Sequence, residues 1–264
     1  MSTAAILHPT EVCANTARIF RKESRYEFVK LIRTRSFSLA TIGFPVMFYV
    51  IFGIANRHAF DGSVHMAKYM LAGYACFGLI GAALFGIGVG LSSDLAAGWL
   101  ELKRASPMPP IAYLLAKCCT AIAFGVIIVN ILTVLGISFA HVHLSLAEYL
   151  RMNAYTIVGA LPFACLGLVI ASLVPFNSAP GIANLIYLPM SFCSGLWVPF
   201  QYLPKALKTA APLLPTFHLA QLQLHSLGAP ANGSTLSHWI GLGSFTLIML
   251  GIAIFAFRRR EQNS

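Results

Sequence analysis

Few side chains in this sequence could perform chemistry, and their spacing matches no catalytic or metal-binding motif. His141 and His143 stand one residue apart, but a solvated pair at the end of an apolar run explains them better than a metal site. The six cysteines form no C-x-x-C pair, so the sequence indicates neither a disulfide framework nor a zinc site. We therefore predict no catalytic residue and no metal ligand in this chain.

Nucleotide-binding patterns are missing or out of context. The phosphate-binding pattern G-x-x-x-x-G-K-[ST] does not occur, so this chain cannot itself be a P-loop ATPase. Gly86, Gly88 and Gly90 lie in a wholly apolar run with no strand before them. Close packing of helices explains these glycines better than a dinucleotide-binding loop.

The elements that carry these residues are long uncharged runs, which are typical of membrane-spanning helices. The chain is 58% apolar and only 10% charged, whereas a soluble domain carries roughly a quarter charged residues. A helix needs about 20 apolar residues to cross roughly 30 Å of hydrocarbon. We expect one all-α integral membrane domain over residues 1–264, with six transmembrane helices. The expected spans are 36–56, 69–92, 118–140, 154–174, 181–198 and 237–257.

Lysine and arginine are distributed unevenly between the two sides of these spans. The terminal segments and the loop after the second span carry thirteen of the 18, and the other side carries five. Cytoplasmic loops accumulate Lys and Arg, so we expect a multi-pass protein of the cell (inner) membrane with both termini in the cytoplasm. The net charge of +10 then reflects topology, and a nucleic-acid partner is not indicated.

Residues 1–35 are expected to form an amphipathic cytoplasmic helix at the membrane surface. Arg18, Arg21, Lys22 and Arg25 recur at i, i+3, i+4 and i+7, which places them on one helical stripe. Such a helix turns its cations toward anionic lipid headgroups. Two roles stay open: an anchor that only fixes the topology, or an anchor that also docks on a cytoplasmic partner.

The loop 94–110 after the second span is too long and too apolar to be a plain connector. Residues 95–102 can form a short helix, which Ser106 and Pro107 would end. Lys117 is expected where the third span leaves the cytoplasmic interface, because a charge at the membrane centre costs about 3 kcal/mol.

Polar residues inside the expected spans are scarce. The spans contain no carboxylate, which argues against an intramembrane enzyme and weakens the case for an ion-coupled transporter. Asn130 and Asn184 are expected to form hydrogen bonds between helices rather than to bind substrate.

The stretch 199–232 before the last span is divided by prolines but stays apolar. We expect it to form short re-entrant helices that dip back into the outer leaflet.

In this order of elements the chain resembles the permease subunits of ABC type-2 exporters. The resemblance covers nearly the whole chain, and two groups of residues carry it most specifically. They are Gly98, Trp99, Leu100, Glu101, Leu102, Ser106 and Pro107 in the loop, and Leu203, Pro204, Pro215 and Phe217 in the external stretch.

The resemblance implies a homodimer of this chain with two copies of a separate ABC ATPase bound beneath it. The loop 94–110 would be the coupling helix, with Glu101 as a polar docking contact and its apolar neighbours as further contacts. This chain would hold no cofactor, since ATP and Mg²⁺ would sit on the partner. It would be a transport subunit and not an enzyme.

The substrate is expected to be hydrophobic or amphipathic, such as a drug, lipid, glycolipid or lipid-linked saccharide, because the expected spans carry no charge. Alternatives without an ATPase partner stay open: a membrane anchoring or assembly subunit, or an ion-coupled transporter.

Overall fold

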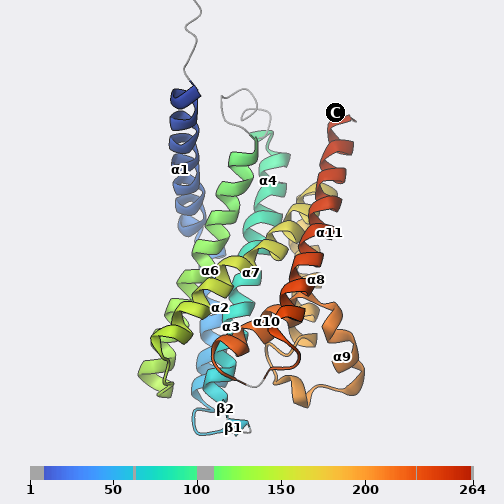
Figure 1. The fold of residues 1–264 in the computed structure, drawn as a ribbon. Helices are drawn as coiled ribbons and strands as arrows, with labels where there is room; N and C mark the ends of the chain where they lie inside the picture. Colours follow the sequence, from blue (N-terminus) through green and yellow to red (C-terminus); the bar gives the residue numbers. More distant parts are fainter. Residues whose placement is uncertain (1–8, 62–63, 100–109, 230, 263–264) are drawn as a thin grey trace, which may run out of the picture.

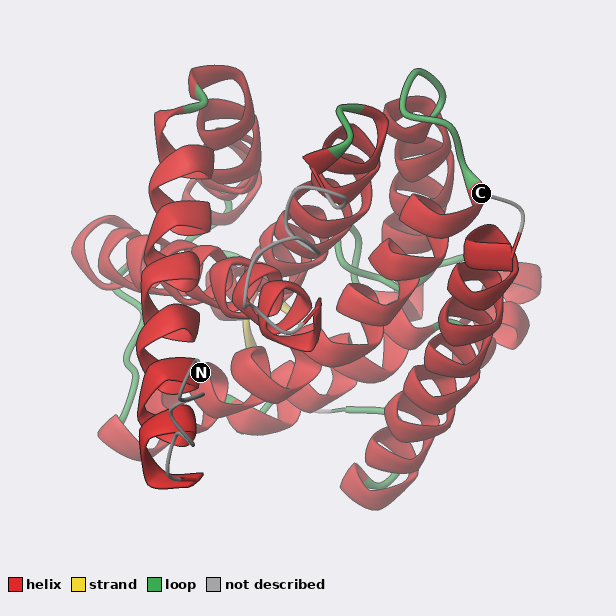
Figure 2. Ribbon diagram, turned by 90° about the horizontal axis from the view of Figure 1, so that it is seen from above, coloured by secondary structure: helices red, strands yellow, loops and turns green. Residues whose placement is uncertain are grey.

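The structure is a computed structural model that describes residues 9–61, 64–99, 110–229 and 231–262. Helices make up nearly all of the regular structure in these residues (Figures 1 and 2), which confirms the all-α prediction. The exception is a hairpin of two very short antiparallel strands, β1 (Phe60–Asp61) and β2 (Val64–His65).

The described chain contains eight longer helices. They are α1 (Pro9–Arg33), α2 (Arg35–Phe48), α3 (Met66–Ala83), α6 (Pro110–Ala140), α7 (Leu146–Leu173), α8 (Ala179–Cys193), α10 (Pro215–Ser226) and α11 (Thr235–Gln262). Two π-helical turns, η1 (Tyr49–Ile54) and η2 (Leu84–Val89), extend α2 and α3, and α4 (Gly90–Ala96) follows η2. The short elements η3 (Phe200–Tyr202), α9 (Lys205–Ala210) and η4 (Ala211–Leu213) precede α10.

Five helices of the described chain are long and apolar enough to cross a membrane. They are Arg35–Ile54, Met66–Ala96, Ile111–Ala140, Leu146–Leu173 and Thr235–Arg259. The remaining expected span, 181–198, coincides with α8, which has 15 residues and is therefore roughly 22 Å long. Helix α8 ends early because Gly195, just beyond its last turn, takes a left-handed conformation with φ of +80°.

The two ends of the described chain lie at the same end of the helix bundle, which we call the terminal end (Figure 1). The β hairpin, α9 and α10 lie at the opposite end, which we call the hairpin end. Helix α11 runs from the hairpin end to the terminal end, whereas α2 continues from the end of α1 toward the hairpin end.

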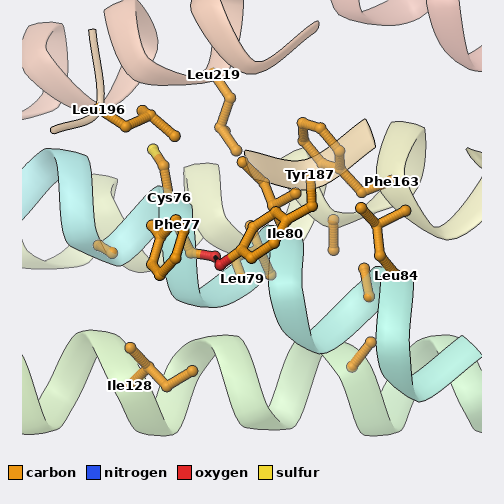
Figure 3. Close-up of a cluster of buried hydrophobic side chains, with 14 of the residues drawn as sticks. Cys76, Phe77, Leu79, Ile80, Leu84, Ile128, Phe163, Tyr187, Leu196 and Leu219 are labelled. Carbon is orange, nitrogen blue, oxygen red and sulfur yellow. Dashed lines mark hydrogen bonds between the residues drawn. The ribbon is translucent and has the colours of Figure 1, made fainter. Parts of the chain in front are cut away.

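Helix α3 is the centre of the bundle. Sixteen of its 18 residues are buried, and Figure 3 shows its side chains between Ile128 of α6 and Leu219 of α10. Small residues allow this close packing. A Cβ atom added at Gly73 would lie 2.2 Å from the carbonyl oxygen of Leu196, so this position needs glycine.

The glycines that follow α3 pack helices together, as the sequence predicts. A Cβ atom at Gly88 would lie 3.3 Å from the carbonyl oxygen of Gly167 on α7. Gly90 has a different neighbour: a Cβ there would lie 3.8 Å from the Nζ atom of Lys117.

Candidate functional site

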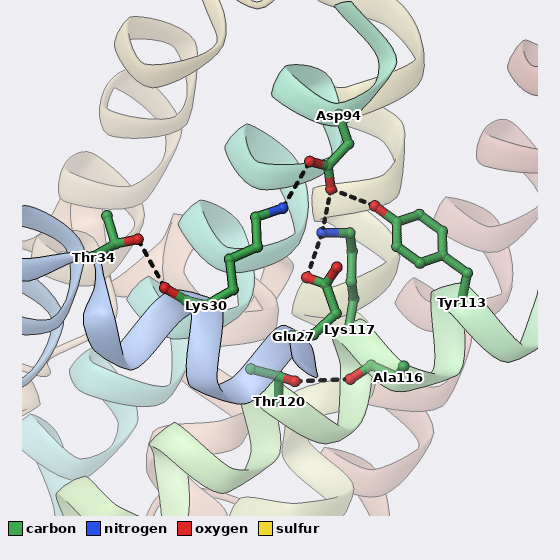
Figure 4. Close-up of polar contacts among 8 residues, drawn as sticks. All are labelled: Glu27, Lys30, Thr34, Asp94, Tyr113, Ala116, Lys117 and Thr120. Carbon is green, nitrogen blue, oxygen red and sulfur yellow. Dashed lines mark hydrogen bonds and ion pairs between the residues drawn. The ribbon is translucent and has the colours of Figure 1, made fainter. Parts of the chain in front are cut away.

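Charged side chains from three helices meet inside the bundle (Figure 4), and we call this group the ion cluster. The Nζ atom of Lys117 on α6 lies 3.0 Å from Oε2 of Glu27 on α1 and 2.8 Å from Oδ2 of Asp94 on α4. The Nζ atom of Lys30, also on α1, lies 2.8 Å from Oδ1 of Asp94. The hydroxyl of Tyr113 donates a further hydrogen bond to Asp94.

The ion cluster is balanced in charge and deeply buried. It contains two cations and two carboxylates, and the side chains of Glu27 and Lys117 are only 1% and 3% exposed. Burying such groups is tolerated when every charge is paired, because an unpaired buried ion loses its hydration without compensation. The cluster therefore stabilises the structure as a set and would be costly to break.

Lys30 sits at the partly exposed edge of the ion cluster. Burial lowers the pKa of Lys30, but the hydrogen bond to Asp94 and the charges of Glu27 and Asp94 raise it by more, so the net pKa lies above its usual value. The ammonium group therefore stays charged at any physiological pH.

Helix α1 has one face that is exposed and an opposite face that packs inside the bundle. Arg18, Arg21, Lys22 and Arg25 are all exposed, as the predicted stripe requires. The opposite face packs against α6, where the Phe28 and Phe124 ring centroids are 5.6 Å apart. Glu27 belongs to this inward face, which explains an acidic residue within a basic segment.

One expectation about charge is wrong. Lys117 lies near the start of the third candidate span, Ile111–Ala140, where it is buried between Glu27 and Asp94, and its place at the membrane interface stays a prediction. Asp94 was expected to begin the loop, yet it lies in the last turn of α4 and within the second candidate span. The spans are therefore not free of carboxylates.

The predicted docking segment begins where α4 ends. Gly98 has a φ of +70°, which stops the helix, and the Trp99 side chain that follows is 45% exposed. The other predicted docking residues, Leu100, Glu101, Leu102, Ser106 and Pro107, lie outside the described residues. Helix α6 follows this segment in the chain, so the two described helices on either side of it, α4 and α6, both contribute to the ion cluster.

A pocket of about 910 Å³ lies between α2, α3 and α8. All of its lining residues lie in the described chain, and none of them is charged. Aromatic contacts shape its wall: the Phe48 and Trp197 ring centroids are 4.8 Å apart, and those of Phe77 and Tyr187 are 4.6 Å apart. Its aromatic lining residues are Phe37, Phe44, Phe48, Phe77, Phe85, Tyr187 and Trp197.

The two membrane asparagines have different roles. Asn130 on α6 accepts a hydrogen bond from the hydroxyl of Tyr149 on α7, so the predicted contact between helices is confirmed there. Asn184 on α8 instead lies exposed on the wall of the pocket. Its amide makes no hydrogen bond to any residue that the structure describes, so the predicted contact is not made between helices of the described chain.

The predicted external residues lie in the short helices at the hairpin end. Leu203 and Phe217 are each only 4% exposed, whereas Pro204 is exposed and precedes α9. Pro215 begins α10, where its missing N–H costs nothing. Ten of the 12 residues of α10 are buried in the described bundle, and its re-entrant position stays a prediction.

Sequence reasoning could not find the ion cluster because its partners are far apart along the chain. Glu27 and Lys117 are separated by 90 residues, and Lys30 and Asp94 by 64. One local signal was present: a lysine and an aspartate near the ends of two apolar runs need partners, because isolated charges there are expensive.

Comparison with known proteins bears on this same region. Residues 20–227 match the protein family described as ABC-2 type transporter. The chain is also similar to the putative transport permease YvfS of Bacillus subtilis (strain 168). The two are 25% identical over 201 residues, which cover 76% of this chain and 82% of that protein. The family match spans the ion cluster, the segment after α4 and the pocket.

Proposed function

Because this chain belongs to the ABC-2 type transporter family and is the membrane permease subunit of such a transporter, we propose that it forms half of an ATP-driven exporter. Two copies of the chain form the substrate path. Each copy binds a separate ATPase subunit, which carries ATP and Mg²⁺. The chain is a transport subunit with no catalytic domain of its own.

The ion cluster is the observation that carries this proposal. Helices α4 and α6 flank the proposed docking segment, and the cluster fastens both of them to α1 through Asp94, Lys117 and Glu27. A displacement of the segment by an ATPase therefore moves three helices together. The ATPase can drive this only if its ATP-bound and ATP-free states bind the segment with different affinity.

The exposed cations of α1 support the proposed orientation. Anionic lipids of the cytoplasmic leaflet attract basic helices at the membrane surface, by about 1 kcal/mol per Lys or Arg. The stripe from Arg18 to Arg25 would then lie at the cytoplasmic surface, together with both termini. With α8 as a short crossing, the chain passes through the membrane six times.

The pocket supports a hydrophobic or amphipathic substrate. Small-molecule sites enclose roughly 300–1,000 Å³ and are lined mostly by apolar and aromatic groups, and this pocket has that size and lining. It lacks any charge to neutralise an ionic ligand. In the proposed dimer a second copy faces α2 and α8, so that the pocket becomes part of the path between the subunits.

Affinity purification of the whole chain from mild detergent tests the proposal. An ATPase subunit is expected to co-purify in equal amount, and Glu101→Lys combined with Trp99→Ala is expected to release it. Lys208→Glu combined with Leu213→Ala makes similar changes at the hairpin end and is expected to keep the ATPase. Recovery of the chain alone under several mild conditions would favour the anchoring or assembly alternative.

A further inference from the structure

Histidines from two helices gather at the hairpin end, where α10 meets the first turn of α11. The Nδ1 atoms of His218 on α10 and His238 on α11 are 3.0 Å apart. The Nε2 atom of His238 lies 2.7 Å from the carbonyl oxygen of Asn232. His225 lies beside them: its Nε2 atom is 3.4 Å from the carbonyl oxygen of Gly233, and its ring centroid is 6.2 Å from that of His238.

Neighbouring residues hold both rings of the pair in place. His238 is only 2% exposed. The ring of Phe217 packs against both, with centroid distances of 5.7 Å to His218 and 5.8 Å to His238. Gly241, one turn further along α11, leaves room for the His218 ring, because a Cβ atom there would lie 2.4 Å from its Nε2 atom.

The hydrogen bonds determine which nitrogen atoms carry protons. A carbonyl oxygen only accepts, so the Nε2 atom of His238 carries a hydrogen, and the neutral ring then presents a lone pair at Nδ1. His218 donates its Nδ1–H to that lone pair. When both rings are charged, each Nδ1 carries a hydrogen. Two donors then face each other, and the hydrogen bond is lost.

Burial also opposes a charge on this pair. Desolvation by burial is the largest influence on the pKa of His218, and it lowers that pKa. The pKa of His218 is thus lower while α10 packs against α11 than it would be in water. The packing of α10 on α11 is therefore most favourable above the ordinary histidine pKa of about 6.5, and it weakens as the pH falls below that value.

Among the residues that the structure describes, no carboxylate near the pair is free to stabilise the protonated rings. Glu148 of α7 forms a 2.6 Å ion pair with Lys68 of α3 and caps its own helix. Glu261 lies at the far end of α11. The other titratable side chains that the structure describes on α10, α11 and the elements packed against them are Tyr149, Arg151, Tyr155 and Cys165 on α7, Tyr69, Tyr74 and Cys76 on α3, Tyr187 and Cys193 on α8, and Arg258 and Arg259 on α11.

We propose that His218 and His238 form a proton-binding latch that holds α10 against α11 while the rings are neutral and releases it when both are protonated. The latch lies at the hairpin end, far from the ion cluster, and it does not depend on the proposed ATPase partner.

Hydrogen exchange of the full-length chain in lipid nanodiscs, measured by mass spectrometry, tests the latch. We expect α10 and the first turns of α11 to lose at least about tenfold in protection between about pH 7.5 and about pH 5.5, after correction for the intrinsic exchange rate. His218→Asn keeps an N–H near the position of Nδ1 but cannot titrate, so it is expected to stay protected at both pH values. The matched control His143→Gln removes an exposed histidine outside the pair and is expected to behave like the wild type.

Two results would overturn the latch: equal protection of the wild type at both pH values, or a full acid-induced loss in His218→Asn. If His218→Asn fails to fold, NMR of ¹⁵N-histidine in the wild type decides instead. The latch requires His238 to be the Nε2–H tautomer at neutral pH and His218 to take up its proton only below the ordinary histidine pKa of about 6.5. The opposite tautomer, or proton uptake by His218 at or above about 6.5, would reject it.

Discussion

Lys117 and Glu27 are separated by 90 residues in the chain, yet the lysine Nζ atom lies 3.0 Å from a carboxylate oxygen of Glu27 inside the bundle. This contact ties α1, a helix outside the candidate spans, to the third of those spans. Asp94 extends the tie to the second span, so three separate parts of the chain share one buried cation.

Replacing that cation is expected to destabilise the protein strongly. Lys117→Met leaves two carboxylates close together without their shared partner, which costs about 3–5 kcal/mol. The unfolding free energy, measured by titration with a denaturing detergent, checks this value. Lys68→Met is the matched control, because the Lys68–Glu148 pair is more exposed, and its loss should cost about 1 kcal/mol or less. Equal costs for both variants would contradict the importance of the ion cluster.

Neutralising Glu27 is expected to impair coupling more than ATPase binding. Glu27→Gln keeps the shape of the side chain and leaves the docking segment unchanged, but it weakens the link between α1 and Lys117. In proteoliposomes that also contain the ATPase, the number of substrate molecules moved per ATP should fall several-fold. Glu148→Gln, a similar change at the hairpin end, should alter this ratio little. A normal ratio for Glu27→Gln would show that α1 is not part of the coupling path.

Adding one methyl group where α3 lies directly against the backbone of Leu196 is expected to disrupt packing. Gly73→Ala places a Cβ atom 2.2 Å from a backbone oxygen of Leu196, which cannot move aside as a side chain could. We expect a loss of about 1–3 kcal/mol. At Gly243 of α11 a Cβ meets nothing within 4 Å, so Gly243→Ala should be neutral or stabilise by up to about 1 kcal/mol. Thermal stability in mild detergent ranks the two variants, and the reverse order would contradict the packing.

The exposed amide of Asn184 is expected to select among substrates. Asn184→Leu removes the amide from an otherwise apolar part of the wall. Transport of a substrate with a hydrogen-bonding group should therefore fall about fivefold relative to a fully apolar analogue, which corresponds to one lost hydrogen bond. The neighbouring Leu185 is exposed but does not line the pocket, so Leu185→Ala should leave the ratio unchanged. The comparison is made by dye uptake into inverted vesicles.

The positions of the long helices could be predicted from the sequence because the signal for them is local. An uncharged run of about 20 residues needs no distant partner to identify it. The length of α8 could not be predicted in this way. Its end depends on the left-handed Gly195 and on the packing of the residues that follow, although the apolar run itself continues to Trp197.

The candidate site was predictable only in part. The exposed stripe on α1 follows from helical periodicity, and it appears as expected. The burial of Lys117 and Asp94 depends on pairing across the bundle, which single-sequence spacing cannot reveal. The open position of Asn184 depends on which face of α8 is left uncovered by the rest of the chain.

The shared buried cation also restricts how this sequence can diverge. Any single change of sign at position 27, 94 or 117 places like charges side by side within the ion cluster. Descendants of this chain can therefore change these three positions only in concert, or replace the whole group with apolar side chains. In related sequences, substitutions at positions 27, 94 and 117 should therefore occur together.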